Sequence, residues 1–431
     1  MIRSSAEERR RREGLGRAAL ADLQLAKLND MLAAILPTNE FYARKLAGAS
    51  FPLASLDELS SLPLTAKGEL ALDESDRLGP ANLTWTLDRY TRFHQTSGTH
   101  GRPLPVFDTD DDWQWWIKCW QYVLDAAEVG SKDRALLAFS FGPFIGFWSA
   151  HDALSARGTM TIPGGGMNSL ARLDLIERTE ATVLLCTPTY AMHLVEVAEE
   201  HKINLAHTTI EKIIVAGEPG GSIPAIRRRI EQAWSARVTD HSGASEIGPW
   251  GYADHDQRGL HVLESQFIAE FLDVETGAPA VEGRLSQLVL TSLGRWGLPV
   301  VRYRTGDLVR PVWPQQGPNR FVILDGGVLG RADDMLIIRG VNIYPAAIEQ
   351  ILRSFPEVVE YRLTARKRGE MDELVVEVED RLEQPARIAE ELHLRLGLKV
   401  EVRLAAAMSL PRFEGKGKRF VDHRRKPAVQ R

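Results

Sequence analysis

Apolar residues recur at helical spacing near the start of the chain. Between positions 25 and 35, leucine and isoleucine return every three or four residues, which predicts a helix that Pro37 ends. A second helix is predicted where Ser222 is placed as the N-cap and Pro224 lies in the first turn. Its apolar face consists of Ile223, Ile226, Ile230 and Ala233.

Four short apolar runs predict buried strands. They are residues 135–139, 183–186, 213–216 and 288–291. Helical segments separate them, and this alternation favours an α/β body with a mostly parallel sheet. The 431 residues correspond to about three domains of ~150 residues.

A predicted helix that begins at Asp110 carries four indoles. They belong to Trp113, Trp115, Trp116 and Trp120. This spacing cannot point all four toward one side of a helix. It therefore predicts that some of them line a cleft or an oligomer face.

The pattern changes after about Arg331. The expected elements are a helix at 345–355, an apolar segment near Val358, a strand at 373–379, a helix at 388–396 and a last strand at 399–404. Residues 1–332 are therefore predicted to form a large α/β body with subdomains and mixed or parallel sheets. Residues 333–431 are predicted to form a small, mobile α+β domain.

Composition narrows the class of protein. Hydrophobic residues make up 44% of the chain and charged residues 26%, which is typical of a globular protein. A formal net charge of −5 argues against general binding to nucleic acid or to an anionic membrane. No apolar signal core follows the arginine-rich start, so a cytoplasmic protein is expected. Cys119 and Cys186 alone form neither a disulfide framework nor a four-cysteine zinc site.

The segment Thr96-Ser-Gly-Thr-His-Gly-Arg-Pro103 places small hydroxyl residues between glycines. In such a loop, consecutive backbone N–H groups turn toward one anion and the hydroxyls add further donors. The same composition also fits a plain turn, so both interpretations stand.

A second segment, Asp240-His-Ser-Gly-Ala-Ser-Glu246, presents a hydroxyl and a carboxylate on a glycine turn. Mg²⁺ prefers one or two carboxylates together with phosphate oxygens of a substrate, which suits Glu246. The alternative is a loop whose glutamate is only solvated.

A third segment, Arg302-Tyr-Arg-Thr-Gly-Asp307, also holds a carboxylate on a glycine turn. Such a carboxylate accepts the two hydroxyls of a ribose in other nucleotide folds. An aspartate after a strand is equally ordinary turn chemistry.

A fourth segment, residues 411–419, flanks lysines with glycines. A lysine on a flexible loop can neutralise charge that develops on a transferring phosphoryl group. A solvated basic tail has the same composition.

In this order, the four segments resemble the motifs of the adenylate-forming superfamily, and most closely its phenylacetate–CoA ligase branch. Further matches are residues 39–44, 62–67 and 216–219. The most specific match is the long run Gly330-Arg-Ala-Asp-Asp-Met-Leu-Ile-Ile-Arg-Gly-Val-Asn-Ile-Tyr-Pro345. The resemblance covers nearly the whole chain.

The resemblance implies a two-step, ATP-dependent ligase. A carboxylate attacks the α-phosphate of ATP to give an acyl-adenylate and pyrophosphate, and after rotation of the C-terminal domain coenzyme A displaces AMP. ATP, Mg²⁺, coenzyme A and an aromatic acid such as phenylacetate are the implied partners. Transfer to a carrier protein or an amine, and a non-catalytic nucleotide-binding relative, are the alternatives. The resemblance also leaves a homodimer open.

The resemblance assigns roles to matching positions. Lys416 bridges the substrate carboxylate and the α-phosphate, Glu246 holds Mg²⁺, and Arg331 contacts ribose or phosphate. Asp333 is the implied hinge. The implied nucleotide-binding positions are Thr96, Ser97, Gly98, Thr99, Gly101, Gly217, Glu218, Pro219, His241, Ser242, Gly243, Ser245, Asp307 and Arg331. The implied acyl pocket consists of Phe141, Phe144, Phe147, Ala216 and Gly217.

Two departures from the family bear on this site. Ser242 stands where the family usually has an aromatic residue that stacks on adenine, and His241 is one candidate to replace it. The zinc-binding cysteines of some relatives are absent, so no zinc is expected although His255 and His261 lie in that segment. The phenylalanines of the implied acyl pocket suit core packing equally well.

Overall fold

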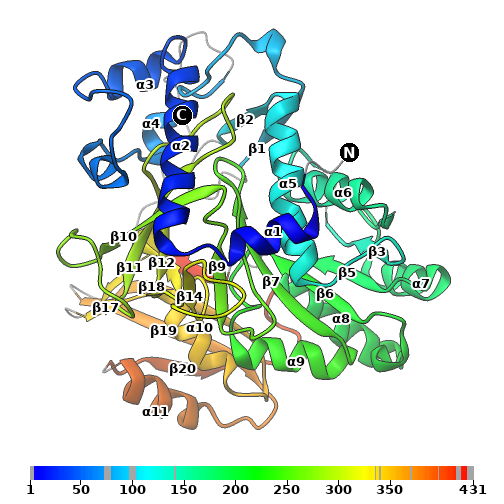
Figure 1. Cartoon of the computed structure of the whole chain (residues 1–431). Helices are drawn as coiled ribbons and strands as arrows, with labels where there is room; N and C mark the ends of the chain where they lie inside the picture. The colour runs from blue at the N-terminus through cyan, green and yellow to red at the C-terminus, as the bar shows by residue number, and fades with distance from the viewer. Residues whose placement is uncertain are drawn as a thin grey trace.

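The computed structural model describes residues 4–71, 79–96, 103–139, 142–334, 336–338, 341–368, 371–396, 398–413 and 419–424. The chain opens with helices α1 (Ala6–Glu13), α2 (Arg17–Ile35) and α3 (Glu40–Lys45) along one side of the body (Figure 1). Helix α2 confirms the first predicted helix and extends it toward the N-terminus. Its apolar face packs against Leu293 and Val301 from the middle of the chain.

A nine-stranded mixed sheet forms the centre of the body (Figure 1). Its spatial order is β13-β14-β9-β8-β7-β6-β5-β3-β4. The neighbouring strands β7, β6, β5, β3 and β4 pair in parallel. The other strands of this sheet pair in antiparallel fashion. The strands are β3 (Arg134–Leu137), β4 (Met160–Pro163), β5 (Val183–Cys186), β6 (Lys212–Ala216), β7 (Arg237–Ala244), β8 (Gly248–Tyr252), β9 (Gly259–Val262), β13 (Pro311–Val312) and β14 (Ile323–Asp325).

Helices cover both faces of the parallel half. Alternate strand residues face opposite sides, so Leu137 packs with α5 (Asp110–Ala126) and α6 (Ile145–Arg157). Its neighbour Leu136 packs with α7 (Ser169–Thr179), α8 (Pro188–His201) and α9 (Pro224–Trp234). The predicted strands at 135, 183 and 213 are confirmed. The N-cap of α9 is Ile223 rather than Ser222, because the Ser222 hydroxyl donates to Asp240 at 2.5 Å.

The prediction that some indoles of α5 face a cleft or an oligomer is wrong. All four are buried, because α1, α6, β2 (Pro105–Asp108) and β8 contact this helix from different sides. Each indole N–H also donates to an internal oxygen, which removes the cost of burying it. The acceptors are Asp152, Gln266, Asp108 and Ser149 for Trp113, Trp115, Trp116 and Trp120, respectively.

A second, four-stranded sheet is antiparallel and has the order β10-β11-β12-β15. Its strands are β10 (Phe267–Asp273), β11 (Ser286–Ser292), β12 (Tyr303–Val309) and β15 (Gly330–Arg331). The apolar run at 288–291 is therefore a strand, but it lies outside the parallel sheet, since a buried antiparallel strand has the same continuous apolar pattern. The α/β class with mixed and parallel sheets is confirmed.

The C-terminal residues form a separate hydrophobic core that includes Ile348, Val376 and Leu392. Its largest sheet has the order β20-β19-β18-β21. The elements are β16 (Leu336–Ile338), β17 (Val341–Ile343), α10 (Pro345–Arg353), β18 (Val358–Arg368), β19 (Met371–Asp380), α11 (Pro385–Leu396), β20 (Glu401–Leu404) and β21 (Phe420–Asp422). The prediction that 399–404 is the last strand is wrong, because β21 follows it and pairs with β18. We call residues 336–424 the C-terminal lobe. The predicted domain boundary at Asp333 falls in the short 3-10 turn Ala332–Asp334.

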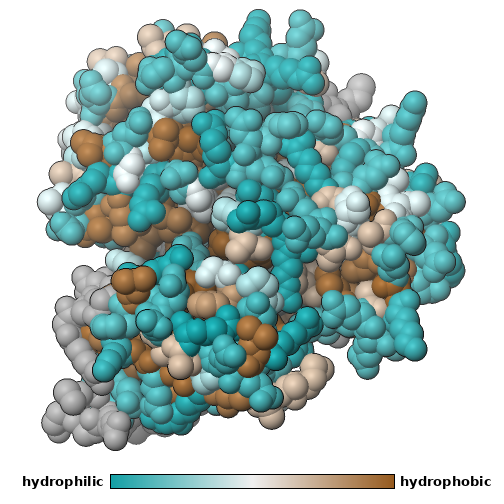
Figure 2. Space-filling model, turned by 90° about the horizontal axis from the view of Figure 1, so that it is seen from below, coloured by the Kyte–Doolittle hydropathy of each residue, from teal (hydrophilic) through white to brown (hydrophobic). Residues whose placement is uncertain are grey.

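The face of the molecule shown in Figure 2 is mostly hydrophilic, and polar residues separate its small hydrophobic patches. Among the described residues, every helix is too short or too polar to cross a membrane.

Candidate functional site

The carboxyl ends of parallel strands β5, β6 and β7 meet at one edge of the large sheet. Ala216 at the end of β6 pairs with His241 in β7, so the predicted segments 216–219 and 240–246 lie side by side. Ligands of open α/β sheets bind at such carboxyl edges. Beyond this edge, β7 turns into β8 by way of Ser245 and Glu246.

Glu246 is buried and contacts two residues from distant parts of the chain. Its Oε1 lies 3.1 Å from Lys67 Nζ and accepts a hydrogen bond from the Tyr303 hydroxyl at 3.0 Å. Burial raises the pKa of Glu246, but the charge of Lys67 and hydrogen bonds from the Glu246 backbone, Lys67 and Tyr303 outweigh it and hold the pKa below its ordinary value. Glu246 is therefore a carboxylate at neutral pH.

Asp307 and Arg331 are paired in the second sheet. Arg331 Nη1 donates to Asp307 Oδ1 at 2.9 Å and to the Thr305 carbonyl at 2.7 Å. Its Nη2 lies 3.6 Å from Asp333 Oδ2, which places the predicted hinge residue beside this pair. Gly306 has φ +79°, and a Cβ there would approach Arg331 Nη2 to 2.7 Å, so this turn requires glycine.

One strand joins these carboxylates into a single cluster. Tyr303 and Asp307 both belong to β12, and after burial itself the charge of Glu246 is the next cause that raises the Tyr303 pKa. The structure thus brings together Glu246, Asp307, Arg331 and Asp333. Sequence reasoning did not assign roles to Tyr303 or Lys67. Tyr303 carried one usable signal, because residues four apart in a strand share a face.

A buried ion pair supports the backbone next to Glu246. Arg295 Nε and Nη2 bind the two oxygens of Asp108 at 2.7 and 2.9 Å, and both side chains are 0% exposed. Arg295 Nη1 donates to the Ser245 carbonyl at 2.8 Å. Trp116 donates to Asp108 at 3.1 Å and lies under the guanidinium. The turn that carries Glu246 is therefore anchored to the interior.

His241 lies within β7, with its ring buried against Trp120 at a centroid distance of 4.4 Å. Its Nδ1 lies 2.7 Å from the Gly251 carbonyl, so this nitrogen carries the proton. Burial lowers the pKa of His241 to about 4, against a smaller opposite effect of that hydrogen bond. Ser242 and Gly243 pair with Gly251 and Pro249 in β8.

Replacing His241 is expected to change the pH dependence of stability. The pKa of His241 is about 4 in the folded protein and 6.5 is its ordinary value. Below pH 6.5 the unfolded chain takes up a proton that the folded protein does not, so the free energy of unfolding falls as the pH is lowered from 6.5 toward 4. Wild type should lose ~3 kcal/mol more than His241→Asn between pH 7 and pH 4. Urea unfolding at both pH values measures the difference, with exposed His255→Asn as the matched control. Equal losses in wild type and His241→Asn would contradict the prediction.

The turn after β6 holds Gly217, Glu218 and Pro219. Gly217 has φ +95°, and Glu218 Oε1 accepts the backbone N–H of Thr189 at 2.8 Å. Burial raises the pKa of Glu218 in spite of its hydrogen bonds to Thr189 and the charge of Arg419. The first turn of α8 and the predicted nucleotide-binding turn are therefore bonded to each other.

The predicted acyl-pocket residues occupy different environments. Phe147 is buried in the main core beside α5, as expected if it serves core packing. Phe144 at the start of α6 is 41% exposed. Ala216 ends β6. Thr96 closes the base of the glycine-rich loop by exchanging hydrogen bonds with Leu104. Predicted residues Ser97, Gly98, Thr99, Gly101, Phe141 and Lys416 lie outside the described residues.

The histidine segment between the two acidic motifs has structural partners. His261 Nε2 lies 2.7 Å from Asp254, and Nδ1 lies 2.9 Å from the Phe321 carbonyl. Within the described ranges, no three His, Cys, Asp or Glu side chains converge in a way that could hold a metal ion.

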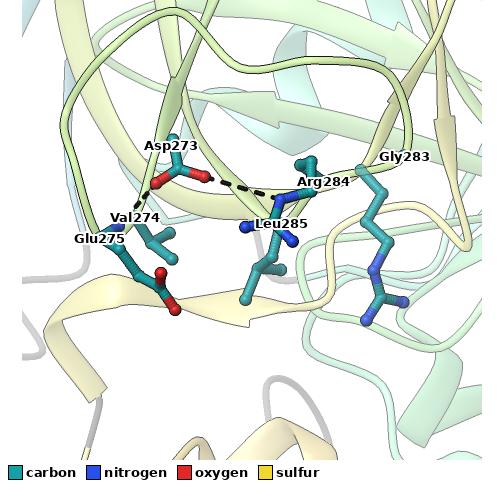
Figure 3. A pocket seen from close by; sticks show the side chains of 7 residues that line it. Asp273, Val274, Glu275, Gly283, Arg284 and Leu285 are labelled. Atoms are coloured by element: carbon teal, nitrogen blue, oxygen red, sulfur yellow. Dashed lines mark hydrogen bonds and ion pairs between the residues drawn. The ribbon is translucent and has the colours of Figure 1, made fainter.

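A cavity of about 310 Å³ lies beside the end of β10 and β11 at which Asp273 pairs with Ser286 (Figure 3). Asp273 lies between the Glu275 backbone and the Arg284 guanidinium, 4.0 Å away, at its rim. The lining residues are Asp273, Val274, Glu275, Gly283, Arg284, Leu285 and Arg310. None of them belongs to the predicted motifs.

The chain is similar in sequence to a known domain family and to a known ligase. Residues 340–424 match the model of the AMP-binding enzyme C-terminal domain. A phenylacetate–coenzyme A ligase of Thermus thermophilus is 30% identical, over 96% of this chain and 98% of that protein.

Among solved structures, 2-hydroxyisobutyryl-CoA ligase in its postadenylation state has a TM-score of 0.90 at 25% identity, over 98% of this chain and 94% of the other. The same ligase in its thioesterification state has a TM-score of 0.72 at 26% identity, over the same shares of the two chains. The arrangement of this chain is therefore closer to the postadenylation state.

Proposed function

The chain belongs to the phenylacetate–coenzyme A ligase family, and from that membership we propose that it joins an aryl carboxylic acid such as phenylacetate to coenzyme A. The protein is an AMP-forming acid–thiol ligase that uses ATP and works in two steps. Two observations support the finer proposal. The similarity spans almost the full length of both chains, and three charged residues that the motifs predict, Glu246, Asp307 and Arg331, lie in one cluster.

In the first half-reaction, a carboxylate oxygen of the acid bonds to the α-phosphorus of ATP, and the bond to the β-phosphate breaks to release pyrophosphate. Asp307 is proposed to accept the ribose hydroxyls while Arg331 holds it in place. Backbone N–H groups of residues 97–101 and the amine of Lys416 are proposed to neutralise the phosphates and the acid. These groups act by positioning and electrostatics.

Glu246 is proposed to hold Mg²⁺. It is an ionised, buried carboxylate at the carboxyl edge of the sheet, and Lys67 and Tyr303 both contact its Oε1. The motifs assign one carboxylate to the metal, so phosphate oxygens of ATP are proposed to complete the ligand set, as Mg²⁺ prefers. When bound, Mg²⁺ supplies charge neutralisation on the phosphates.

In the second half-reaction, the sulfur of coenzyme A bonds to the acyl carbon and the bond to AMP breaks. We propose that the residues after 332 rotate about Asp333 between the steps, as one domain against residues 1–332. The exposed carboxylate of Asp333 lies only 3.6 Å from Arg331, so a change at this hinge is felt beside Asp307. The cytoplasm is the compartment proposed for the reaction, since both cysteines are free thiols.

Pyrophosphate exchange tests the proposal. Each acid of a panel, including phenylacetate, benzoate and 2-hydroxyisobutyrate, is incubated with ATP, labelled pyrophosphate and the protein, and thioester formation is then measured with coenzyme A. Exchange and thioester formation with an aryl acid are the expected results. No exchange with any acid would refute the ligase, and exchange without a thioester would assign the acyl group to another acceptor. A strong preference for 2-hydroxyisobutyrate would refute the aryl acid.

A further inference from the structure

Helix α8 presents two polar side chains to the C-terminal lobe. Thr189 and Glu196 are seven residues apart in this helix, about two turns, so they lie on the same side of it. The helix begins directly after β5, with Thr187 as N-cap and Pro188 in its first turn. Thr189 therefore lies at the carboxyl edge of the sheet, where its N–H binds Glu218.

Arg419 of the C-terminal lobe contacts Thr189. Its Nη1 donates to the Thr189 hydroxyl at 3.1 Å. Its Nε and Nη2 bind the two oxygens of Glu360 at 2.5 and 2.9 Å, and this ion pair is buried. A continuous series of polar contacts thus runs from Glu360 through Arg419 and Thr189 to Glu218 at the proposed nucleotide edge.

Arg412 makes the corresponding contact at the other end of the helix face. Its Nε donates to Glu196 at 3.3 Å, and Nη1 and Nη2 bind the two oxygens of Glu379 at 3.1 and 2.7 Å. Glu379 belongs to the C-terminal lobe, as Glu360 does. Each arginine is therefore oriented by a carboxylate of its own lobe and offers a remaining N–H to α8.

The two arginines stand on either side of residues 413–418, which include Lys416. We propose that Arg412 and Arg419 are positioning residues that dock the C-terminal lobe on α8 for adenylation. The inference rests on the proposed function. Because polar contacts between lobes separate more readily than an apolar core, the lobe can leave α8 for thioester formation.

Variants of α8 test this role and leave the two arginine–glutamate pairs of the C-terminal lobe intact. In Thr189→Val/Glu196→Gln, the acceptor hydroxyl and the negative charge are removed, while the Thr189 N–H that binds Glu218 remains. The kcat of pyrophosphate exchange should fall by about tenfold to hundredfold, since one neutral and one charged hydrogen bond are lost. Conversion of a supplied acyl-adenylate and coenzyme A to the thioester should stay within about twofold, and the KM for ATP should not change.

Two controls separate docking from loss of structure. Thr189→Ser keeps the hydroxyl and should retain exchange. Glu199→Gln removes a carboxylate of the same helix that pairs with Arg381 at 3.4 Å across the same boundary, but both of those side chains are largely exposed, so its effect should stay within about twofold.

Three results would overturn parts of this account, and they differ from one another. If the wild-type protein catalyses exchange and Thr189→Val/Glu196→Gln does so at the same rate, the docking role is refuted and the proposed function stands. Equal loss of both half-reactions, with an unchanged melting temperature, would show that the α8 contacts do not act on adenylation specifically. Absence of exchange in the wild-type protein would refute the proposed function and this inference together.

Discussion

Glu246→Gln should lower the kcat of adenylation by about 10²–10³-fold, the range expected when one preorganised electrostatic group is lost. Glutamine has the same shape, and its amide oxygen can still accept from Tyr303 and Lys67, which now contact Oε1. What disappears is the negative charge at a site where burial makes charge effective. Pyrophosphate exchange at saturating ATP and acid measures the loss.

Tyr303→Phe is the matched control, because it removes a donor to the same oxygen and keeps the charge. One hydrogen bond to a charged group contributes about 1.5 kcal/mol at the low end of its usual range, which corresponds to about tenfold, so the loss of kcat should be smaller than that of Glu246→Gln. The Mg²⁺ concentration for half-maximal rate should rise only in Glu246→Gln. An equal rise in both variants, or in neither, would contradict the assignment of Glu246 as the metal carboxylate.

The acidic cluster was predictable because its members lie in local motifs. A glycine turn after a strand fixes where Asp307 and Glu246 stand relative to their own strands, and the order of the motifs identifies the family. Lys67 and Arg295 reach the same cluster from positions about 180 residues before and about 50 residues after Glu246. No local pattern encodes a contact that only the folded chain creates.

The errors about the fold have the same origin. Periodicity describes one face of an element, whereas α5 is enclosed on several sides, so its four tryptophans are all buried. The run at 288–291 is apolar because both faces of its strand are buried. Burial does not reveal whether a strand pairs in parallel or antiparallel, and this strand pairs antiparallel with both neighbours. Strand β21 has only three residues, too few for alternation to be visible.

Arg295→Met should destabilise the protein by about 3–5 kcal/mol, the cost of leaving one partner of a buried ion pair without the other. Asp108 is 0% exposed and, of its side-chain partners among the described residues, would keep only the indole N–H of Trp116. Asp112 lies close by, and its pKa is raised to about 6 by burial first and by the charge of Asp108 second. Without Arg295, the carboxylate of Asp108 would therefore lie near a second acidic residue, Asp112, and would have lost its cation. Urea unfolding followed by tryptophan fluorescence measures the loss.

The double variant Asp108→Asn/Arg295→Met separates the two roles of Arg295. Asparagine still accepts from Trp116 and carries no charge, so the double variant should recover most of the stability that Arg295→Met loses. It does not restore the donor to the Ser245 carbonyl, so the turn that carries Glu246 stays unanchored and pyrophosphate exchange should remain as low as in Arg295→Met. Recovery of both properties together would mean that Arg295 acts on the reaction only through overall stability. Failure of stability to recover would mean that the uncompensated charge of Asp108 is not the cause of the loss.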